Sequence, residues 1–428
     1  MAGIRPFFKK ISRRKFIHQT AAVMTGSVLG LSCKSAHVAA RPVVKFGVPG
    51  YSVPTYRQAL DELGFTRETG IEVEIIQRPN APNELMTQMV GAIYAGTSPY
   101  DVLDFEDEIA SSFLPVGWFL PLDDLLTPDF WSDLTRPLRE MTDLWNRHDG
   151  ATYRVHHNFE PCYWWYRQDW FAEKKLPPPQ TWQEVAQLGS VFTDRKKGVW
   201  ASEEGMIKGG FLNVYISWLV RQAGGTPFQV DDKLGSALEY IYNLMHRDRV
   251  LNPACLQKNY DQQNSDYMAD RVAFMRQWPF FYDVTRQNKN WYSEEKVTCT
   301  LPPAGPAGKS FCTYAAGWGY GIPKTVKDAK ASGELIKFLT DKEIAAKLVR
   351  YSSWFLNARY SVLKEAGDSG PARYLKLYTD AGIITTRPHH PKFMEALAIV
   401  ENAVSAFLSN QIKFGKTIQL IKDQIELL

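Results

Sequence analysis

"VVKFGVPGYSVPTYRQALDEL", Val43 to Leu63, opens with a strand, a Pro-Gly turn and a helix, and this pattern then repeats. The next apolar run, IEVEII, alternates apolar and acidic residues, NELMTQMVGAIYAG has helical spacing, and YDVLDF is a third strand. A β-α-β-α-β order predicts a parallel sheet with helices on both faces. The fold class expected is therefore α/β.

Ligands of open parallel sheets collect beyond the carboxyl ends of the strands. PGYS follows the first strand and EDE follows the third, so both segments are expected on one rim of the sheet. Tyr51, Glu106 and Asp107 are therefore candidate ligand-binding residues. For the two acids, a solvated helix N-terminus is an equally good interpretation.

The length of 428 residues suggests two or three domain-sized units, and 45% hydrophobic residues can fill a sizeable core. An aromatic fraction of 13% can also supply a binding cleft. No basic stripe of the kind that nucleic-acid binding requires is found, so we expect no nucleic-acid partner.

The first forty residues have the pattern of an export signal, expected over 1–40. The pair Arg13 and Arg14, with Phe16 two places beyond, precedes a short uncharged run, and VAA (Val38–Ala40) offers a cleavage site. This resembles a twin-arginine signal. A basic amphipathic start is the alternative, and lipid anchoring at Cys33 is possible but not favoured. The segment carries seven Lys and Arg and no acid, so 43 basic and 46 acidic residues remain after cleavage, a net charge of −3.

Four cysteines would remain in the exported chain: Cys162, Cys255, Cys299 and Cys312. Cys299 and Cys312 flank a turn-rich loop between two β-like runs, so they could form a disulfide across a hairpin. Two free buried thiols are the alternative.

The order of motifs along the chain resembles the family 1 extracellular solute-binding proteins, the carbohydrate receptors of ABC importers. The motifs are FTRETGIEVEI, SPYDVLDFEDEIASSFLPVGWFLPLDDLL, GATYRVHHNFEPCYWWYRQDWF, SWLVRQAGG, AFMRQWPFF, AGWGYGIPK and TTRPHHPKF. RQWPFF and AGWGYGI look like segments of the subgroup that binds disaccharides and related glycosides. His156, His157 and Ser217 depart from that subgroup, which leaves the particular sugar open.

The resemblance implies a two-lobed periplasmic-binding-protein-like fold of type II, with a ligand cleft between lobes joined by hinge segments. The lobes are expected at 41–158 with 314–352, and at 159–313 with 353–428. It also implies an exported receptor, periplasmic or held at the cell envelope, that delivers a sugar or small glycoside to the permease subunits of an ABC importer. We expect a monomer that is not an enzyme and holds neither a cofactor nor a metal.

Sugars present an apolar face that stacks on aromatic rings and hydroxyls that bond to carboxylates and amides. Trp318 is the best platform candidate, because Gly317 and Gly319 on either side should leave its ring bare. Trp278, between a strand end and Pro279, is a second platform. For both rings, a place in the core is the alternative interpretation.

Glu160 is a lone acid in the apolar stretch HNFEPCYWWY, so it needs a ligand or a partner such as Arg154 or Arg167. Trp354 and Asn357 are expected at the rim of the cleft. In YWWY at most two rings can face one cleft, because alternate strand residues point to opposite sides.

Two rival functions remain. A hydrolase could use Glu106 and Glu160 as paired carboxylates. A metal receptor could use tyrosines with His389 and His390, although no further ligand spacing accompanies these histidines.

Overall fold

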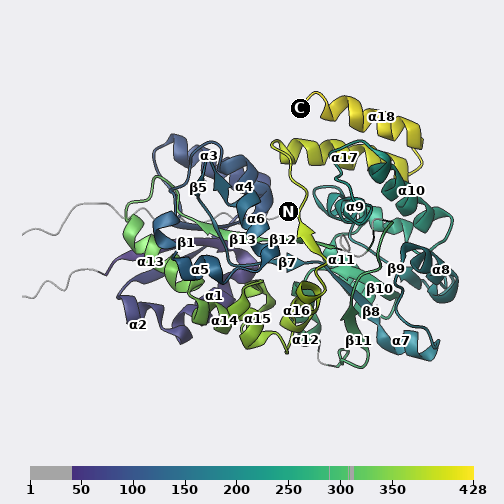
Figure 1. Ribbon diagram of the computed structural model, residues 1–428, viewed down its shortest axis with the longest axis horizontal. Helices are drawn as coiled ribbons and strands as arrows, with labels where there is room; N and C mark the ends of the chain where they lie inside the picture. Colours follow the sequence, from purple (N-terminus) through teal and green to yellow (C-terminus); the bar gives the residue numbers. More distant parts are fainter. Residues whose placement is uncertain (1–40, 289, 307, 309–312) are drawn as a thin grey trace, which may run out of the picture. The chain divides into compact units, whose positions relative to one another are not determined.

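The computed structural model describes residues 41–288, 290–306, 308 and 313–428. The expected export signal with Cys33, and Cys312 of the proposed disulfide, lie outside these residues. The described residues form two α/β lobes, as predicted (Figure 1).

The first lobe is built on a five-stranded sheet in the order β2-β1-β3-β13-β6. β1 pairs in parallel with β2 and with β3, which confirms the predicted parallel order, whereas β13 is antiparallel to both β3 and β6. The strands are β1 (Val43–Pro49), β2 (Glu72–Arg78), β3 (Val102–Glu106), β6 (Val155–His156) and β13 (Trp318–Gly321), with the small pair β4 (Arg147–His148) and β5 (Ala151–Thr152) beside them.

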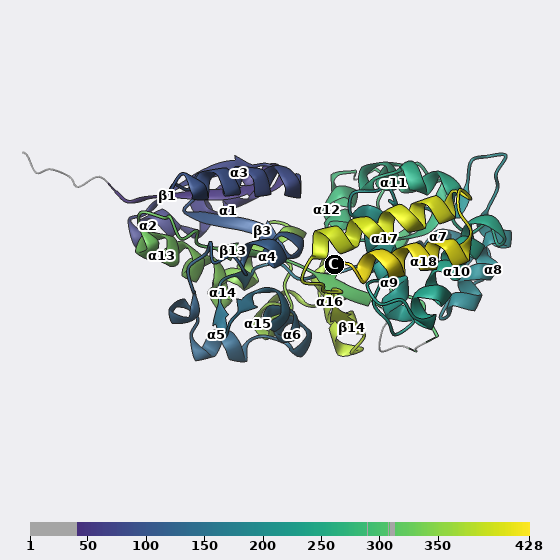
Figure 2. The same ribbon diagram turned by 90° about the horizontal axis from the view of Figure 1, so that it is seen from above.

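Helices pack around this sheet; α4 contacts β3, the central strand, and α3 contacts α4 (Figure 2). Phe105 and Leu103 of β3 are fully buried in a cluster with residues of both helices. The helices of this lobe are α1 (Val53–Leu63), α2 (Phe65–Thr69), α3 (Pro82–Tyr94), α4 (Asp107–Phe113), α5 (Pro128–Ser132), α6 (Arg136–Trp145), α13 (Ala329–Thr340), α14 (Lys342–Leu348) and α15 (Tyr360–Ala366).

The second lobe contains a four-stranded sheet in the order β11-β8-β10-β9. The YWWY run lies in β8 between two neighbouring strands, and all four rings are buried. This is within the limit expected from the sequence, that at most two of the four rings could face one cleft. The strands are β8 (Tyr163–Arg167), β9 (Trp200–Ser202), β10 (Val272–Gln277) and β11 (Val297–Thr300).

Two long helices near the end of the chain, α17 (Phe393–Leu408) and α18 (Phe414–Ile425), pack against each other, and α17 also contacts α9 and α10 (Figure 2). Buried Glu401 of α17 accepts backbone N–H groups from Gly209, Gly210 and Asn213, and so caps the start of α9. The other helices of this lobe are α7 (Gln168–Glu173), α8 (Trp182–Phe192), α9 (Phe211–Gln222), α10 (Asp232–His246), α11 (Tyr260–Met268), α12 (Phe280–Gln287) and α16 (Ala372–Asp380).

The described cysteines, Cys162, Cys255 and Cys299, are free and buried. Burial raises the pKa of each thiol well above its usual value, so these side chains behave as apolar core residues.

A third sheet, in the order β14-β12-β7, connects the two lobes. β7 (Glu160–Pro161) is antiparallel to β12 (Thr313–Ala316), and β14 (Ile384–Thr386) is parallel to β12. Only Gly317 separates β12 from β13, so one extended segment passes directly from this sheet into the sheet of the first lobe.

The segment after Trp354 runs back along the first lobe. The carboxylate of Asp133, just beyond α5, accepts hydrogen bonds from Arg359 and Ser361, and the hydroxyl of Thr135 donates to the carbonyl of Ala358. The lobe boundaries expected from the sequence remain predictions.

The junction at Gly317 is fixed by a buried carboxylate. Asp107 is completely buried, and its Oδ2 accepts the backbone N–H of Gly317 at 2.8 Å. Its Oδ1 contacts the guanidinium of Arg154 and lies 2.9 Å from Nε2 of His156. Burial on its own would raise the pKa of Asp107, but Arg154 and His156 hold it below its usual value. This network ties β3, β6 and β13 together.

Gly317 and Gly319 allow backbones to approach closely, a role that the sequence analysis did not assign to them; that they also leave the ring of Trp318 bare stays a prediction. A Cβ at Gly317 would stand 2.8 Å from the carbonyl oxygen of Asn158 and 2.8 Å from Cδ2 of His156. One at Gly319 would stand 2.7 Å from the carbonyl oxygen of Val155. Both glycines therefore serve strand packing.

Gly317→Ala is therefore expected to lower the free energy of unfolding by about 1–3 kcal/mol, because its methyl group would force backbone atoms apart. Urea titration followed by circular dichroism measures the change. Gly91→Ala is the matched control in α3: apart from its chain neighbours and the backbone of its own helix, no atom lies within 4 Å of its Cβ position, so it should stabilise the helix by about 0.5–1 kcal/mol. Equal effects of the two substitutions would contradict the close-packing explanation.

Candidate functional site

The rim predicted from the sequence is present at the carboxyl ends of the parallel strands of the first lobe. Tyr51 lies in a short 3-10 turn after β1, Arg78 ends β2 and Glu106 ends β3. Trp318, the first residue of β13, pairs directly with Glu106. Four side chains distant in the sequence are thus brought to one edge of the sheet.

Three rings gather there, and we call Tyr51, Trp318 and Trp354 the aromatic cluster. The Tyr51 ring stands edge-on to the other two, with centroid distances of 6.4 Å to Trp318 and 5.2 Å to Trp354. Trp318 and Trp354 are 4.9 Å apart and tilted by 60°. Tyr51 is 57% exposed and Trp318 is half-buried, whereas Trp354 is buried. The cluster therefore presents aromatic surface to solvent from a packed base.

Trp354 forms the buried base of the aromatic cluster, because hydrogen bonds to residues of the interior fix its position. Its Nε1 donates to the hydroxyl of Tyr56 at 3.4 Å, and its carbonyl accepts Nδ2–H of Asn158 at 3.0 Å. It lies in a 3-10 turn, Ser353–Phe355, and not at the exposed rim where the sequence had placed it.

Glu106 is paired with a buried cation that the sequence analysis missed. Arg78 is 1% exposed, and its Nη2 donates to Oε2 of Glu106 at 2.8 Å while its Nε donates to the carbonyl of Asp104 at 2.8 Å. Its Cζ also lies over the Trp318 ring, 5.0 Å from the centroid. Burial raises the pKa of Glu106 to about 7, and Arg78 is the main opposing influence. The position of Arg78 at the end of an amphipathic strand is the one sequence signal that could have indicated it.

Glu160 has a different environment. Both partners suggested from the sequence are engaged elsewhere, Arg154 with Asp107 and Arg167 with Asp169 and Asp270. Within the described residues Glu160 forms no ion pair; its Oε1 accepts Nδ2–H of Asn158 at 2.9 Å. Burial raises its pKa to about 7, with only that hydrogen bond opposing the effect. Glu160 is therefore a buried carboxylate with spare hydrogen-bonding capacity.

The two carboxylates are connected through the crossover segment. Glu160 pairs with Ala316 in β12, and Glu106 pairs with Trp318 in β13, so only Gly317 separates their strand partners. One carboxylate stands at the end of the first-lobe sheet and the other in the connecting sheet.

Three other residues predicted for the site make hydrogen bonds within the protein. At the Gly317 junction, the carboxylate of Asp107 accepts the backbone N–H of Gly317. Asn357 is buried, with its Nδ2 3.4 Å from the carbonyl of His157. It is therefore not at the rim where the sequence had placed it.

Trp278 follows β10 in the second lobe and is buried. Its Nε1 donates to the hydroxyl of Tyr260 at 3.1 Å, and its ring lies 6.1 Å from that of Tyr314. These contacts place it among second-lobe rings and outside the aromatic cluster.

The two histidines that depart from the family pattern belong to buried networks of the first lobe. His156 contacts Asp107, and burial, with Arg154 beside it, lowers its pKa to about 4. His157 lies 2.9 Å from Oδ1 of Asp104 and stacks on the Tyr320 ring at 4.3 Å. Both histidines support the strands that carry the site.

His389 and His390, the suggested metal ligands, have other contacts. The His389 ring packs edge-on against Trp145 at 4.8 Å, and Nδ1 of His390 accepts the backbone N–H of Lys392. Among the described residues, no group of three or more His, Cys, Asp or Glu side chains is placed to hold a metal ion.

An open depression of about 440 Å³ lies apart from the predicted site, between α1 and α14. Its acid, Glu62, accepts hydrogen bonds from Gln58 and from the hydroxyl of Tyr351, each at 2.9 Å. We assign no ligand to it. In the described part of the chain, no helix has both the length and the apolar character needed to cross a membrane.

The chain is similar to a curated bacterial protein and to two solved structures. A curated relative, "Probable ABC transporter-binding protein" of Deinococcus radiodurans, is 26% identical over 175 residues, but the match covers only 38% of this chain and 41% of that protein. The maltose-bound T. maritima MalE3 has a TM-score of 0.76 at 19% identity, covering 90% of this chain and 99% of its own. The GacH receptor of Streptomyces glaucescens, solved unliganded and with acarbose, has a TM-score of 0.76 at 17% identity and covers 90% and 97%.

At these identities the two structures establish the shared fold. The family model described as bacterial extracellular solute-binding protein matches residues 50–346, well over half of the chain. The chain therefore belongs to the bacterial extracellular solute-binding proteins.

Proposed function

We propose that this protein is an exported receptor that binds a sugar, a disaccharide or small glycoside, and delivers it to the permease of an ABC importer. The observation that carries the proposal is the aromatic cluster beside two buried carboxylates, Glu106 and Glu160. Rings that expose a face suit the apolar side of a sugar, and carboxylates accept hydrogen bonds from its hydroxyls. The bound maltose and acarbose of the two similar structures support the same ligand class.

The proposed ligand site comprises the side chains predicted from the sequence, and they have different roles. Tyr51 and Trp318 offer the stacking surface, Trp354 supports it, and Glu106 and Glu160 orient hydroxyls. Arg78 positions two of these groups from the interior of the lobe, because it donates a hydrogen bond to Glu106 and covers one face of the Trp318 ring. Asp107, Gly317 and Asn357 position these groups, and Trp278 would reach the ligand from the second lobe.

The mechanism we propose is closure of the two lobes over the ligand, with hinges at the crossovers near Phe159 and Ala315. Pairing of Ala315 with Pro161, and the hydrogen bond from the Phe159 N–H to the carbonyl of Leu356 at 2.7 Å, support hinges at this place. A ligand that contacts both lobes binds the closed form better and shifts the population toward it. The receptor acts as a monomer without a cofactor and returns its ligand chemically unaltered.

A thermal-shift screen of the protein from residue 41 onward, with mono-, di- and trisaccharides, polyols and glycosides, tests the function. We expect stabilisation by a disaccharide or glycoside, and chromatography after prolonged incubation should recover that compound intact. Cleavage products, lost in Glu160→Gln, would instead support a hydrolase.

Trp318→Ala should remove a stacking surface worth about 1–3 kcal/mol, and so weaken binding by roughly one to two orders of magnitude in isothermal titration calorimetry. Its effect on stability should stay below that of Trp164→Ala, a control in the core of β8, where truncation typically costs about 3–5 kcal/mol. Normal affinity in a readily unfolded Trp318→Ala protein would make this ring a core residue only.

Ligand affinity should rise with pH, because Glu106 and Glu160 ionise with pKa values of about 7 and a carboxylate accepts stronger hydrogen bonds than a carboxyl group. Each group that must be ionised contributes about a tenfold increase between pH 6 and pH 8. Glu160→Gln should remove one such factor and leave that of Glu106. Affinity that is independent of pH in the wild type would contradict these roles.

Ionisation of Glu106 and Glu160 should lower the free energy of unfolding, although it should strengthen ligand binding. Their folded pKa values lie above the usual 4.5, so folding favours the protonated forms, and stability should fall as pH rises from about 4.5 through 7. Glu160→Gln should therefore be more stable than the wild type at pH 8, with the difference diminishing toward pH 4.5.

We further propose export through the twin-arginine route with cleavage near Ala40, on the basis of the Arg13-Arg14 pair and the VAA site. The double substitution Arg13→Lys and Arg14→Lys should leave the uncleaved precursor in the cytoplasm, as measured by fractionation and immunoblotting. Unchanged export of that variant would exclude this route.

A further inference from the structure

A small cavity lies in the interior of the first lobe, between the end of β6, helices α13 and α14, and the segment that follows Trp354. Its volume is about 10 Å³, counted as the space open to the centre of a water molecule. A single water molecule needs about that much space, so neither a second water nor a larger molecule fits. All of the lining residues are buried, among them Leu348, Phe355, His157, Asn357 and Arg359.

His157, which lines the cavity, has one ring nitrogen without a partner. Its Nε2 lies 2.9 Å from Oδ1 of the fully buried Asp104. A carboxylate only accepts hydrogen bonds, so Nε2 carries the hydrogen of this contact. In the neutral ring the other nitrogen, Nδ1, is then an acceptor. It is buried, and none of the described residues forms a hydrogen bond with it.

Asn357, on the opposite wall, also has an acceptor without a partner. Its Nδ2 lies 3.4 Å from the carbonyl oxygen of His157 and donates to it, which assigns the two ends of the amide, because two oxygen atoms would not bond. Oδ1 is buried, and it has no donor in the described part of the chain. The cavity is thus lined by two residues that each need a hydrogen-bond donor.

The pair of acceptors selects the kind of occupant. A hard cation such as Ca²⁺ takes about six or more oxygen ligands, but no space remains here for waters to complete its shell, and the guanidinium of Arg359 in the wall opposes a positive charge. An anion offers no hydrogen to either acceptor, and a halide needs more space than the cavity has. Water fits, because it has two O–H donors and no net charge.

We propose that this cavity binds one water molecule, which donates one hydrogen bond to Nδ1 of His157 and the other to Oδ1 of Asn357. Buried polar groups in proteins are nearly always paired, and buried waters commonly supply the missing partner. The water joins the end of β6 to the segment that runs back along the first lobe. This site is independent of the proposed function, since it requires no bound sugar.

The water completes a chain of hydrogen bonds that reaches the base of the aromatic cluster. Oδ2 of Asp104 accepts the hydroxyl of Tyr56 at 3.0 Å, and that hydroxyl accepts Nε1–H of Trp354 at 3.4 Å. From Asn357 the chain passes through the water, His157, Asp104 and Tyr56 to Trp354, three residues before Asn357. The water therefore fixes the tautomer of His157 and closes this loop of contacts.

A crystal structure of the purified protein at high resolution tests the site directly. Density for one water should lie within about 2.7–3.2 Å of both Nδ1 of His157 and Oδ1 of Asn357. A cavity without density, or a water that contacts neither atom, would overturn the proposal. This measurement uses the wild-type chain, so it does not depend on the folding of a variant.

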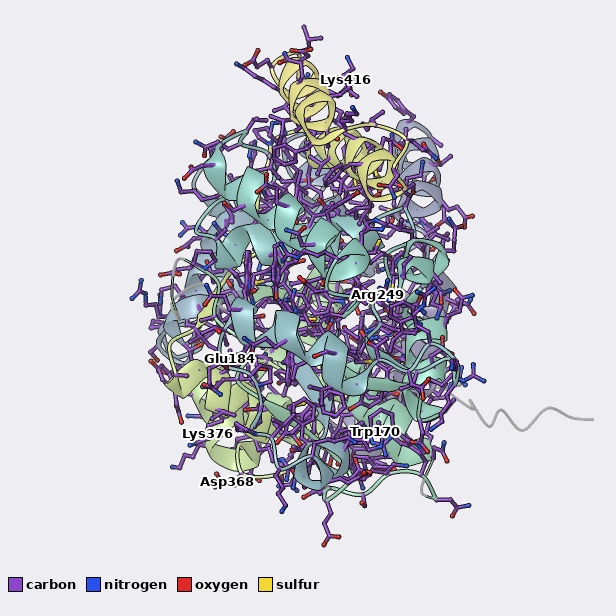
Figure 3. All side chains as sticks on the ribbon, turned by 90° about the vertical axis from the view of Figure 1, so that its right-hand side faces the viewer. Trp170, Glu184, Arg249, Asp368, Lys376 and Lys416 are labelled. Carbon is purple, nitrogen blue, oxygen red and sulfur yellow. The ribbon has the colours of Figure 1, made fainter. Side chains whose placement is uncertain are left out.

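Oxygen-17 magnetic relaxation dispersion counts, in solution, the waters that stay bound for longer than the protein takes to tumble. Asn357→Leu keeps a similar side-chain volume but removes the acceptor, so the count should fall by one. Lys416→Leu is the control, because this side chain is exposed on α18 of the second lobe (Figure 3), and its count should equal that of the wild type. An unchanged count in a folded Asn357→Leu protein would contradict the proposal.

Nitrogen-15 NMR of the histidine rings gives a readout that a purely apolar packing role of residue 357 would not move. In the wild type, His157 should be the Nε2–H tautomer with a hydrogen-bonded Nδ1. In Asn357→Leu the Nδ1 resonance should move toward that of an acceptor without a donor. A wild-type His157 that carries its hydrogen on Nδ1 would show that the water does not donate to this atom, and would overturn the assignment.

Discussion

The buried carboxylate of Asp107 is the constraint on which the rest of the first lobe depends. It accepts hydrogen bonds from the backbone of Gly317 on one oxygen and contacts Arg154 and His156 on the other. The N–H of Asp107 also donates to the carbonyl of Gly317 at 3.1 Å, so the two residues are bonded in both directions. A charge without solvent is tolerated only when it is paired and hydrogen-bonded in this way. The crossing of the chain between the sheets at Gly317 is consequently held in one position, with Trp318 directly after it.

Glu106 and Glu160, the two acids of the candidate site, lie on either side of this crossover and have different surroundings. Glu106 ends a strand of the first-lobe sheet and forms an ion pair with Arg78. Glu160 belongs to the connecting sheet and has the amide of Asn158 as its partner. Both have pKa values raised by burial, but only one has an adjacent cation. In the proposed site, a ligand hydroxyl would therefore complete the hydrogen bonding of Glu160 more readily than that of Glu106.

The fold was predictable because its signals are local. The strand and helix periods of residues 43–106 indicate a parallel sheet, and the order of motifs indicated the family. The site was only partly predictable, since it depends on which side chains meet across long sequence separations. Tyr51 and Glu106 followed from strand ends and Trp318 from its flanking glycines, whereas Arg78 became visible only when β2 was placed beside β1 and β3. The packing role of the glycines beside Trp318 was not predictable, because sequence alone does not reveal the backbone of β6 packed against them. The interior positions of Trp354 and Asn357 likewise depend on tertiary contacts.

The guanidinium of Arg78 over the Trp318 indole has a stereochemical consequence. One π-face of the indole is occupied by this side chain, so in the proposed site a pyranose ring would have to approach the opposite face. A one-sided platform distinguishes the two faces of a sugar: epimers with an axial hydroxyl directed at the indole are held off, and those with axial C–H bonds there make close contact. If Trp318 is the sugar platform that we propose, the buried cation Arg78 would thus contribute to the choice between epimers without touching the ligand.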